Sequence, residues 1–260
     1  MVAVLLGRKP AVADPRVPFL HWLDRRSAPL PDPPPWANWY AGVPEWPMLG
    51  NDIAGDCVCA MAGHATQQFS NYRDQELTPT TDEALALYSA ITGYDPTNPA
   101  TDQGTVVMGP SGLMQYWATH GVVFGGANSK AGGFAQVQIE PRLDSVRQAI
   151  HYFGGIGLGI NLPECVVAGA MIPYMWGDFA GAVAGGHEVW VDGYDVSVGG
   201  TRYFDFVSWG QRYRMTAEFL LAVSEEAVAI YDADSINARG LNADGIDVAT
   251  LTAAMASLAA

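Results

Sequence analysis

Cys57 is the side chain of this sequence best placed to act as a nucleophile. Asp56 precedes it in the position of a helix N-cap, and apolar residues recur near helical spacing from Cys57 to about Tyr72. The unpaired backbone amides at a helix N-terminus favour the thiolate, which is the nucleophilic form of cysteine. Because free cysteines more often serve as small buried packing groups, Cys57 also needs a base before chemistry is indicated.

Histidine is the side chain that exchanges a proton near neutral pH, so it is the natural partner for a thiol. Of the five histidines, His64 comes seven residues after Cys57, about 10 Å along the same expected helix and outside hydrogen-bond reach. Two others lie near the ends of expected helices, where the helix dipole explains them. His187 begins an expected strand directly after Gly185 and Gly186, where small residues let another segment approach closely. The sequence therefore predicts His187 as the base.

Asn51 could complete the site as an oxyanion-hole donor. It stands six residues before Cys57, and its side-chain amide could act with the Cys57 backbone amide on a developing oxyanion. A simple Asn-Asp turn whose side chains bond to the local backbone is the alternative.

Metal and cofactor chemistry is not expected from this sequence. Cys57, Cys59 and His64 resemble part of a metal-ligand set, but no second ligand pair with short spacing accompanies them. The chain has no P-loop and no Gly-x-Gly-x-x-Gly at a strand-to-helix turn. We therefore predict neither a metal ion nor an organic cofactor.

The elements that must position these residues fall into two groups. Hydrophobic periodicity and capping residues predict helices over 57–72, 81–92, 111–120, 143–153 and, capped by Thr216, about 217–223. Alternating or apolar runs predict strands over 156–160, 188–194, 201–208 and 227–231, the last as an edge strand, with a turn at 199–200. Helices that come mainly first and strands that come mainly later predict a segregated α+β architecture.

Four short motifs, taken in order, resemble those of papain-like cysteine peptidases. They are Asn51, Gly55-Asp-Cys57 opening a helix, Gly186-His187 opening a strand that ends in Gly193-Tyr194, and Ser208-Trp209-Gly210. The resemblance covers about residues 43–231 and implies a papain-like two-lobed fold, with a helical left lobe, an antiparallel β-barrel-like right lobe and a cleft between them. The resemblance implies that Asn51 occupies the sequence position of the family's oxyanion-hole glutamine. It also implies that Trp209 shields the catalytic pair from water and that Gly55, Asp56 and Gly186 line the substrate cleft.

The residue that orients the histidine is where the sequence departs from the family. Val207 stands in place of the usual asparagine and cannot hydrogen-bond to an imidazole. Asp205, two residues earlier on the same strand face, is our candidate substitute, although one strand step of about 6–7 Å separates the two positions. Ser208, a backbone carbonyl or a water molecule are the alternatives. Glu188 should point to the opposite face from His187 and belong to the surface or to a second layer.

The rest of the sequence and its composition limit the partners. Residues 1–42 form a Pro- and Trp-rich arm expected to extend over the domain at 43–231, and residues 232–260 form a tail with a short Ala-rich helix. Both could contact a second copy of the chain or an assembly partner. The formal charge of −14 disfavours nucleic acid and anionic membranes as partners.

The expected compartment follows from what the sequence lacks. It shows no signal-like segment, no membrane-spanning apolar run, and only three cysteines, too few and odd in number for a disulfide framework. We therefore expect a cytoplasmic protein, or a component of a particle such as a virion that is assembled in the cytoplasm.

Two functions fit these residues. The first is a cysteine hydrolase, a peptidase or amidase that uses Cys57 and His187 on a peptide or protein substrate. The second is a catalytically weak or inactive papain-like module with a structural or assembly role, for example in a phage virion. Val207, the arm and the tail favour this second reading.

Overall fold

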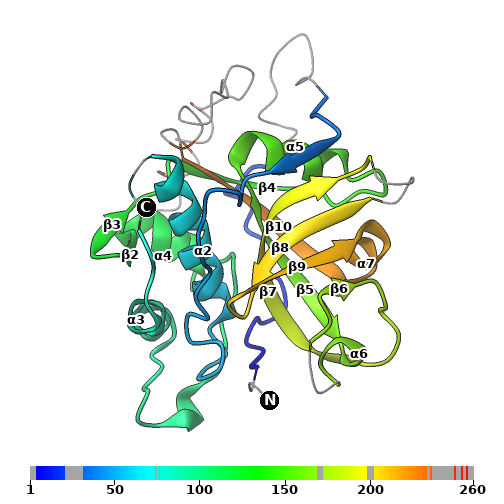
Figure 1. Cartoon of the computed structure of the whole chain (residues 1–260). Coiled ribbons are helices and arrows are strands. Elements are labelled where there is room, and N and C mark those ends of the chain that lie inside the picture. The colour runs from blue at the N-terminus through cyan, green and yellow to red at the C-terminus, as the bar shows by residue number, and fades with distance from the viewer. Residues whose placement is uncertain are drawn as a thin grey trace.

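The computed structural model describes residues 4–20, 32–73, 75, 77–168, 172–197, 202–232, 235, 249, 253 and 256. In this part of the chain, α2, α3 and α4 gather on one side, and a large, mostly antiparallel sheet with three further helices lies on the other, so the expected α+β class is confirmed (Figure 1). The turn predicted at 199–200 and, apart from single positions, the Ala-rich tail helix lie outside the described residues. The division into arm, domain and tail stays a prediction.

The helical side is built around α2, Cys57–Tyr72, which is buried from Cys57 to Ser70. The other elements of this side are α3 (Thr81–Thr92), the 3-10 turn η1 (Pro99–Thr101), α4 (Leu113–His120), and a hairpin of β2 (Val122–Phe124) and β3 (Ala127–Ser129). The predicted bounds of α2 and α3 are confirmed, and α4 begins two residues later than predicted.

The sheet contains eight strands, of which seven run in the order β4-β10-β5-β7-β8-β9-β6 and the eighth, β1, pairs with β7. The strands are β1 (Trp36–Asn38), β4 (Gly133–Gln136), β5 (Ile156–Pro163), β6 (Met175–Trp176), β7 (Val183–Asp195), β8 (Tyr203–Ser208), β9 (Gln211–Thr216) and β10 (Ser224–Tyr231). Neighbouring strands are antiparallel except β6 and β9. The order ends at β4 and β6, so the described strands form an open sheet and no closed barrel.

β10 lies inside this sheet, which corrects the prediction of an edge strand. It pairs with β4 on one side and with β5 on the other. Its residues from Glu226 to Tyr231 are all buried, so both of its faces are covered. The short strand β4 was not predicted, and without it β10 has only one neighbour.

Each face of the sheet packs against a different layer, because successive side chains of a strand point to opposite faces. Trp190 on β7 and its partner Val207 on β8 share a core with α2. Val189 and Phe206 belong to the other core, on the face that α5 and α7 cover. The helices on the sheet side are α5 (Asp144–Phe153), α6 (Glu164–Val167) and α7 (Ala217–Val223).

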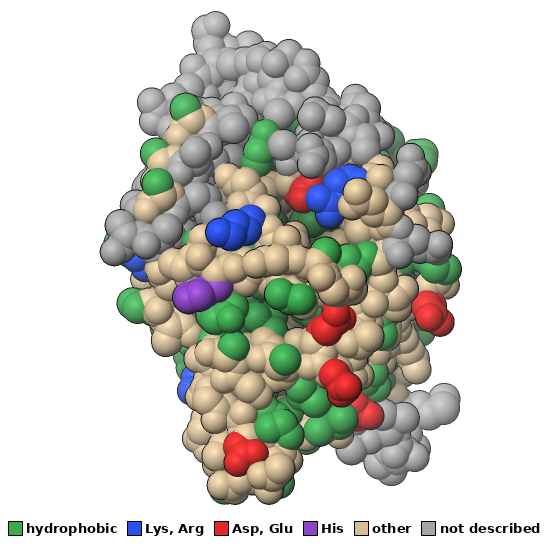
Figure 2. Space-filling view, turned by 90° about the vertical axis from the view of Figure 1, so that its left-hand side faces the viewer, with side chains coloured by type: hydrophobic (Ala, Val, Ile, Leu, Met, Phe, Trp, Pro, Cys, Tyr) green, Lys and Arg blue, Asp and Glu red, His purple; other side chains and the backbone are tan. Residues whose placement is uncertain are grey.

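The surface on the helical side is mixed in character. Acidic side chains are interspersed there with apolar and polar ones, and basic side chains are few (Figure 2). This agrees with the formal charge of −14. Among the described residues, no helix combines the length and the apolar character that crossing a membrane requires.

Candidate active site

Cys57 is the first residue of α2, and its side chain is only 1% exposed. The backbone amides of Gly7 and Glu188 donate toward its sulfur. The Glu188 amide is the peptide link that follows His187. The thiol at the N-terminus of α2 therefore lies against the backbone of β7 next to His187, the residue that precedes the Glu188 amide.

His187 is fully buried and held on two sides. Its Nε2 shares a hydrogen bond of 2.7 Å with Ser208 Oγ. The indole of Trp209 stacks on the imidazole with 4.4 Å between ring centroids and 20° between planes, in the shielding position that the resemblance implied. The other ring nitrogen, Nδ1, has no hydrogen-bond partner among the described residues.

Asp205, the candidate orienting residue, lies elsewhere. Its carboxylate forms a two-pronged hydrogen bond with Arg214 on β9, at 2.7 and 3.0 Å. In the ladder it stands opposite Gly193, six residues beyond His187 along β7, which is about 20 Å at the rise of a strand. The pairing register therefore separates Asp205 from the imidazole.

Side-chain alternation explains why Ser208, and not its neighbour, binds His187. Val207 pairs with Trp190 and points with it toward α2. Ser208 is the next residue and points to the opposite face, where His187 and Val189 also point. Of the alternatives open from the sequence, Ser208 is the one that the geometry selects.

Asn51 is buried beside the helix N-terminus, 2% exposed. Its Nδ2 donates to Asp56 Oδ1, the carboxylate that precedes Cys57. An amide nitrogen carries two hydrogens, so one remains after Asp56 has accepted the other. Asp56 does not cap α2 through its side chain. Its buried carboxyl group, whose pKa burial raises well above the ordinary value, instead accepts from the Asn51 amide beside the N-terminus of α2.

Cys59 and His64, two members of the partial ligand set considered above, are separately accounted for. Cys59 is buried in the core around α2. The His64 ring hydrogen-bonds through Nε2 to the Pro47 carbonyl at 2.9 Å. Across the described ranges no three His, Cys, Asp or Glu side chains gather as a metal site.

The N-terminal segment 5–9 lies over Cys57, between the two sides of the molecule (Figure 1). On the helical side, Leu5 N–H donates to Asn51 O at 2.9 Å, Thr105 N–H to Gly7 O at 2.9 Å, and Lys9 N–H to Thr105 O at 2.8 Å. On the sheet side, Arg8 N–H donates to Gly186 O at 3.1 Å. The segment therefore bridges the helical side and the sheet side next to Cys57.

Two glycines permit this close contact. A Cβ at Gly7 would lie 1.7 Å from the Gly55 carbonyl oxygen, and a Cβ at Gly186 would lie 2.1 Å from the Arg8 carbonyl oxygen. Gly55 and Gly186, both predicted cleft residues, thus contact the segment directly. Residues 1–42 were expected to form an arm, but the contact of its first part with the candidate nucleophile was not predicted. A lone glycine and arginine near a chain start are too weak a signal for that.

Burial under the segment sets the protonation of the pair. It raises the pKa of the Cys57 thiol to about 12, although the Gly7 and Glu188 amides lower it. Burial also lowers the pKa of His187 to about 3. At neutral pH the residues are therefore a neutral thiol and a neutral imidazole.

Comparisons with known proteins agree with this fold. No family model and no curated protein matches the chain. Among solved structures, xylellain, a cysteine protease from Xylella fastidiosa, superposes with a TM-score of 0.67 at 15% identity, over 88% of this chain and 97% of its own. Procathepsin B S9 from Trypanosoma congolense gives a TM-score of 0.60 at 12% identity, over 87% and 86% of the two chains.

A third structure, digestive procathepsin L 3 of Tenebrio molitor larval midgut, gives a TM-score of 0.57 at 13% identity and covers 89% of this chain and 77% of its own. At such identities the similarity establishes the fold and not the activity. The chain has the fold of the papain-like cysteine proteases.

Proposed function

We propose that this protein is a cysteine hydrolase that cleaves amide bonds of peptides or proteins with Cys57 and His187. The observation that carries the proposal is the meeting of the α2 N-terminus with β7. There the thiol lies against the His187–Glu188 peptide link, and Ser208 and Trp209 fix the imidazole. A packing cysteine would not require a buried histidine with one ring nitrogen held and the other without a partner in the described chain.

The chemistry follows from these positions. When Nε2–H donates to Ser208 Oγ, the lone pair of Nδ1 can take the proton of the Cys57 thiol. The thiolate attacks the substrate carbonyl carbon, and the carbonyl electrons move to oxygen. The backbone amide of Cys57 and the remaining hydrogen of Asn51 Nδ2 are the proposed donors to that oxyanion.

The intermediate then collapses in two stages. The C–N bond breaks as the His187 imidazolium gives its proton to the leaving amine, which leaves an acyl group on Cys57. Water then enters, gives a proton to His187 and attacks the acyl carbon. The C–S bond breaks, the carboxylic acid departs, and the thiol regains its proton.

Substitution of Gly7 by valine in the full-length chain tests the proposal. A side chain at position 7 would collide with the Gly55 carbonyl, so the segment cannot keep its present position, and we expect it to be displaced from Cys57. The pKa of Cys57 should then fall from about 12 toward its ordinary value. Below both pKa values, each unit of this fall increases the thiolate fraction about tenfold. We expect iodoacetamide at pH 8 to alkylate Cys57 at least about tenfold faster in Gly7→Val, as followed by peptide mass spectrometry.

The pH dependence supplies a second readout. Labelling of the unaltered chain should keep rising with pH toward 12, whereas labelling of Gly7→Val should level off at a lower pH. Lys9→Ala is the matched control, because Lys9 lies in the same segment but is exposed. Gly7→Val should also hydrolyse peptides, and added Cys57→Ser or His187→Ala should abolish that hydrolysis.

The alternative function is the structural or assembly module, in a cytoplasmic protein or a virion. The closed segment and the protonated thiol favour it, because both also suit an unused site. An unreactive Cys57 and no peptide hydrolysis in Gly7→Val, with the segment shown to be released by its sensitivity to added protease, would decide for that module.

A further inference from the structure

Arg8 enters the sheet side of the molecule directly beside the residue that covers Cys57. Its side chain has no exposed surface. The preceding residue, Gly7, donates toward the Cys57 sulfur, and the Arg8 amide bonds to Gly186, next to His187. The pocket that holds the guanidinium therefore opens at the candidate active site.

Carboxylates form the base of this pocket. Arg8 Nη1 donates to Glu226 Oε1 at 3.0 Å, and Nη2 forms an ion pair with Glu225 Oε2 on the same strand, β10. Nη2 also contacts Asn161 Oδ1 on β5, at 3.3 Å. The guanidinium is thus bound by side chains from two neighbouring strands. We call this site, made by Gly159, Asn161, Glu188, Glu225 and Glu226, the acidic pocket.

Glu188 adds a carboxylate without a partner. It is 2% exposed, and neither carboxylate oxygen has a hydrogen-bond partner among the described residues. The alternation of β7 turns it away from His187, and because α2 covers that face, Glu188 is buried in a second layer and not on the surface. Its charge acts on Arg8: burial lowers the pKa of the guanidinium, and Glu188, Glu225 and Glu226 more than restore it.

Glycines in β5 leave room for these groups. A Cβ at Gly159 would lie 2.8 Å from Glu226 Cγ and 3.0 Å from Arg8 Cδ. A Cβ at Gly157 would lie 3.0 Å from Glu188 Oε1. A side chain at either position would crowd the cation or the acids, so the pocket exists because both positions are glycine.

The walls of the pocket all belong to the sheet and none to the N-terminal segment. They come from β5, β7 and β10, which hold one another through paired backbone. We expect the pocket to persist when the segment leaves, and it then presents two buried glutamates, Glu188 and Glu226, and the partly exposed Glu225 without their cation. Burying a charge without a partner is costly, so such a pocket favours any cationic side chain that can replace Arg8.

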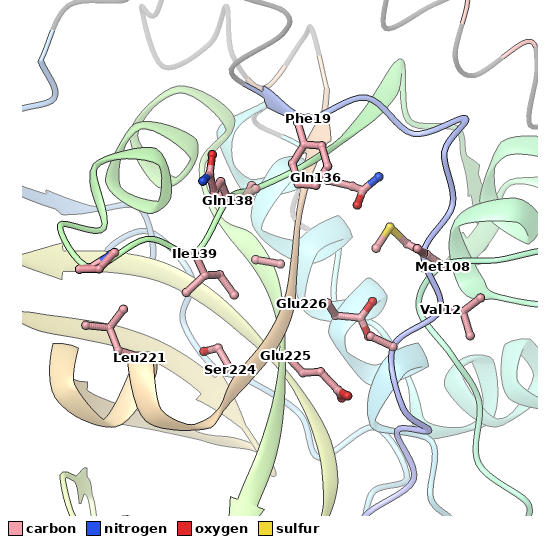
Figure 3. Close-up of a pocket in the computed structure, with 15 residues that line it drawn as sticks. Val12, Phe19, Met108, Gln136, Gln138, Ile139, Leu221, Ser224, Glu225 and Glu226 are labelled. Carbon is pink, nitrogen blue, oxygen red and sulfur yellow. The ribbon is translucent and has the colours of Figure 1, made fainter.

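A larger cavity of about 740 Å³ adjoins the acidic pocket. Glu225 and Glu226 line it from β10, and Val12, Phe19 and Met108 line it from other segments (Figure 3). Figure 3 shows both glutamate side chains pointing toward the N-terminal segment. A chain that placed a cationic residue against these acids would have further space for its next residues.

We propose that the acidic pocket selects substrates with an arginine or lysine side chain adjacent to the residue that lies on Cys57. This inference rests on the proposed function and names its substrate class. Arginine fits better than lysine, because its planar fork can satisfy Glu225 and Glu226 together. The formal charge of −14 attracts cationic peptides to the same site.

The test uses the full-length Gly7→Val chain, in which Arg8 no longer fills the pocket. The substrates are internally quenched peptides of glycine residues with one variable position. That position holds Arg, Lys, Leu or Glu, and the peptides are otherwise identical. We expect kcat/KM for the Arg peptide to exceed that for the Leu peptide at least tenfold, and the Glu peptide to be cleaved slowest. Adding Glu226→Gln should bring the Arg-to-Leu ratio toward one.

Two further variants make the result specific. Glu218→Gln is the matched control, because Glu218 is an exposed glutamate on α7, and it should leave the Arg-to-Leu ratio unchanged. If Glu226→Gln does not fold, Glu225→Gln replaces it, since the Glu225 side chain is 30% exposed. It should lower the same ratio.

Binding separates the pocket from the chemistry. In full-length Gly7→Val with Cys57→Ala, fluorescence anisotropy with labelled, uncleaved peptides should show at least tenfold tighter binding of the Arg peptide than of the Leu peptide. Arg and Leu peptides that agree within twofold in both assays would overturn the inference and leave the hydrolase standing. A binding preference for Arg with an unreactive Cys57 would support the pocket and overturn the hydrolase.

Discussion

The orientation of the His187 imidazole depends on two neighbouring side chains. Ser208 Oγ holds Nε2 at 2.7 Å, and the Trp209 ring covers one face of the imidazole. A catalytic histidine needs a third group mainly to fix its tautomer and orientation, and a hydroxyl can do this without a charge. We therefore assign Ser208 as a positioning residue that acts through His187.

Removal of that hydroxyl should reduce turnover. In the Gly7→Val chain, we expect Ser208→Ala to lower kcat by roughly tenfold or more, because the imidazole loses the bond that orients it. KM should stay within about twofold, since Ser208 does not face the substrate. Stopped-flow or initial-rate assays with the Arg peptide measure both constants.

Ser197→Ala serves as the comparison for this substitution. Ser197 hydrogen-bonds to Asp195 at the exposed end of β7, so its removal should leave kcat unchanged. An unaltered kcat in Ser208→Ala, with a normal melting temperature, would contradict the assignment.

At the scale of elements, β7 serves both parts of the site. Its two-residue period sends His187 to one face, toward Ser208 and Trp209, and Glu188 to the other, toward α2. The candidate base and the acidic pocket are therefore formed by neighbouring residues of one strand whose side chains point to opposite faces. Changing one need not displace the other.

α3 supports the opposite wall. Tyr88 on α3 is buried, its hydroxyl donates to Asp102 Oδ1 at 2.6 Å, and it accepts from the Gly104 amide at 2.8 Å. Asp102 in turn accepts from the Gly55 amide at 2.9 Å. A single hydroxyl thus connects α3 to the loops that contact the N-terminal segment.

Tyr88→Phe should therefore destabilise the protein. It leaves the buried Gly104 amide without its acceptor, and an unsatisfied buried donor costs about 1–3 kcal/mol. Urea denaturation should show a loss of that size in the free energy of unfolding. Tyr174→Phe, at a tyrosine that is 58% exposed, should change it by less than about 0.5 kcal/mol. Equal effects of the two substitutions would refute the role given to Tyr88.

At the scale of the whole molecule, the strongly negative net charge affects which partners can approach. The 27 acidic and 13 basic residues produce a field that attracts cations, and the acidic pocket lies within that field. The same field works against phosphate backbones and anionic lipid surfaces as partners.

Ionic strength should therefore affect substrates unequally. In the Gly7→Val chain, raising NaCl from 20 to 500 mM shortens the Debye length from about 20 Å to about 4 Å. We expect kcat/KM for the Arg peptide to fall several-fold, whereas kcat/KM for the neutral Leu peptide should stay within twofold. A parallel decline of both peptides would show that long-range charge does not assist binding.

The extent to which the sequence predicted this molecule differs between its parts. The bounds of α2 and α3 could be predicted from the sequence, because local hydrophobic periodicity and capping residues define them. The strands β2, β3, β4 and β6 were not predicted. Each has at most four residues, and such a short segment is a strand only because it hydrogen-bonds to a neighbouring strand. β9 was missed as well, because polar and apolar residues alternate along it without a distinctive boundary.

The sequence by itself predicted the α+β, papain-like fold that the structure confirms. It also led to Cys57 and His187 as the proposed nucleophile and base, because a helix N-terminus and a glycine-preceded strand are local features that can be read along the chain. Only the tertiary structure decided which residue holds the imidazole, because Ser208 and Asp205 are distinguished by strand register and not by type. The structure alone also revealed the segment over the thiol and the pocket around Arg8. Both join residues that are far apart along the chain, about 50 positions for Gly7 and Cys57 and more than 150 for the Arg8 contacts with Asn161 and Glu226, and only folding brings such residues together.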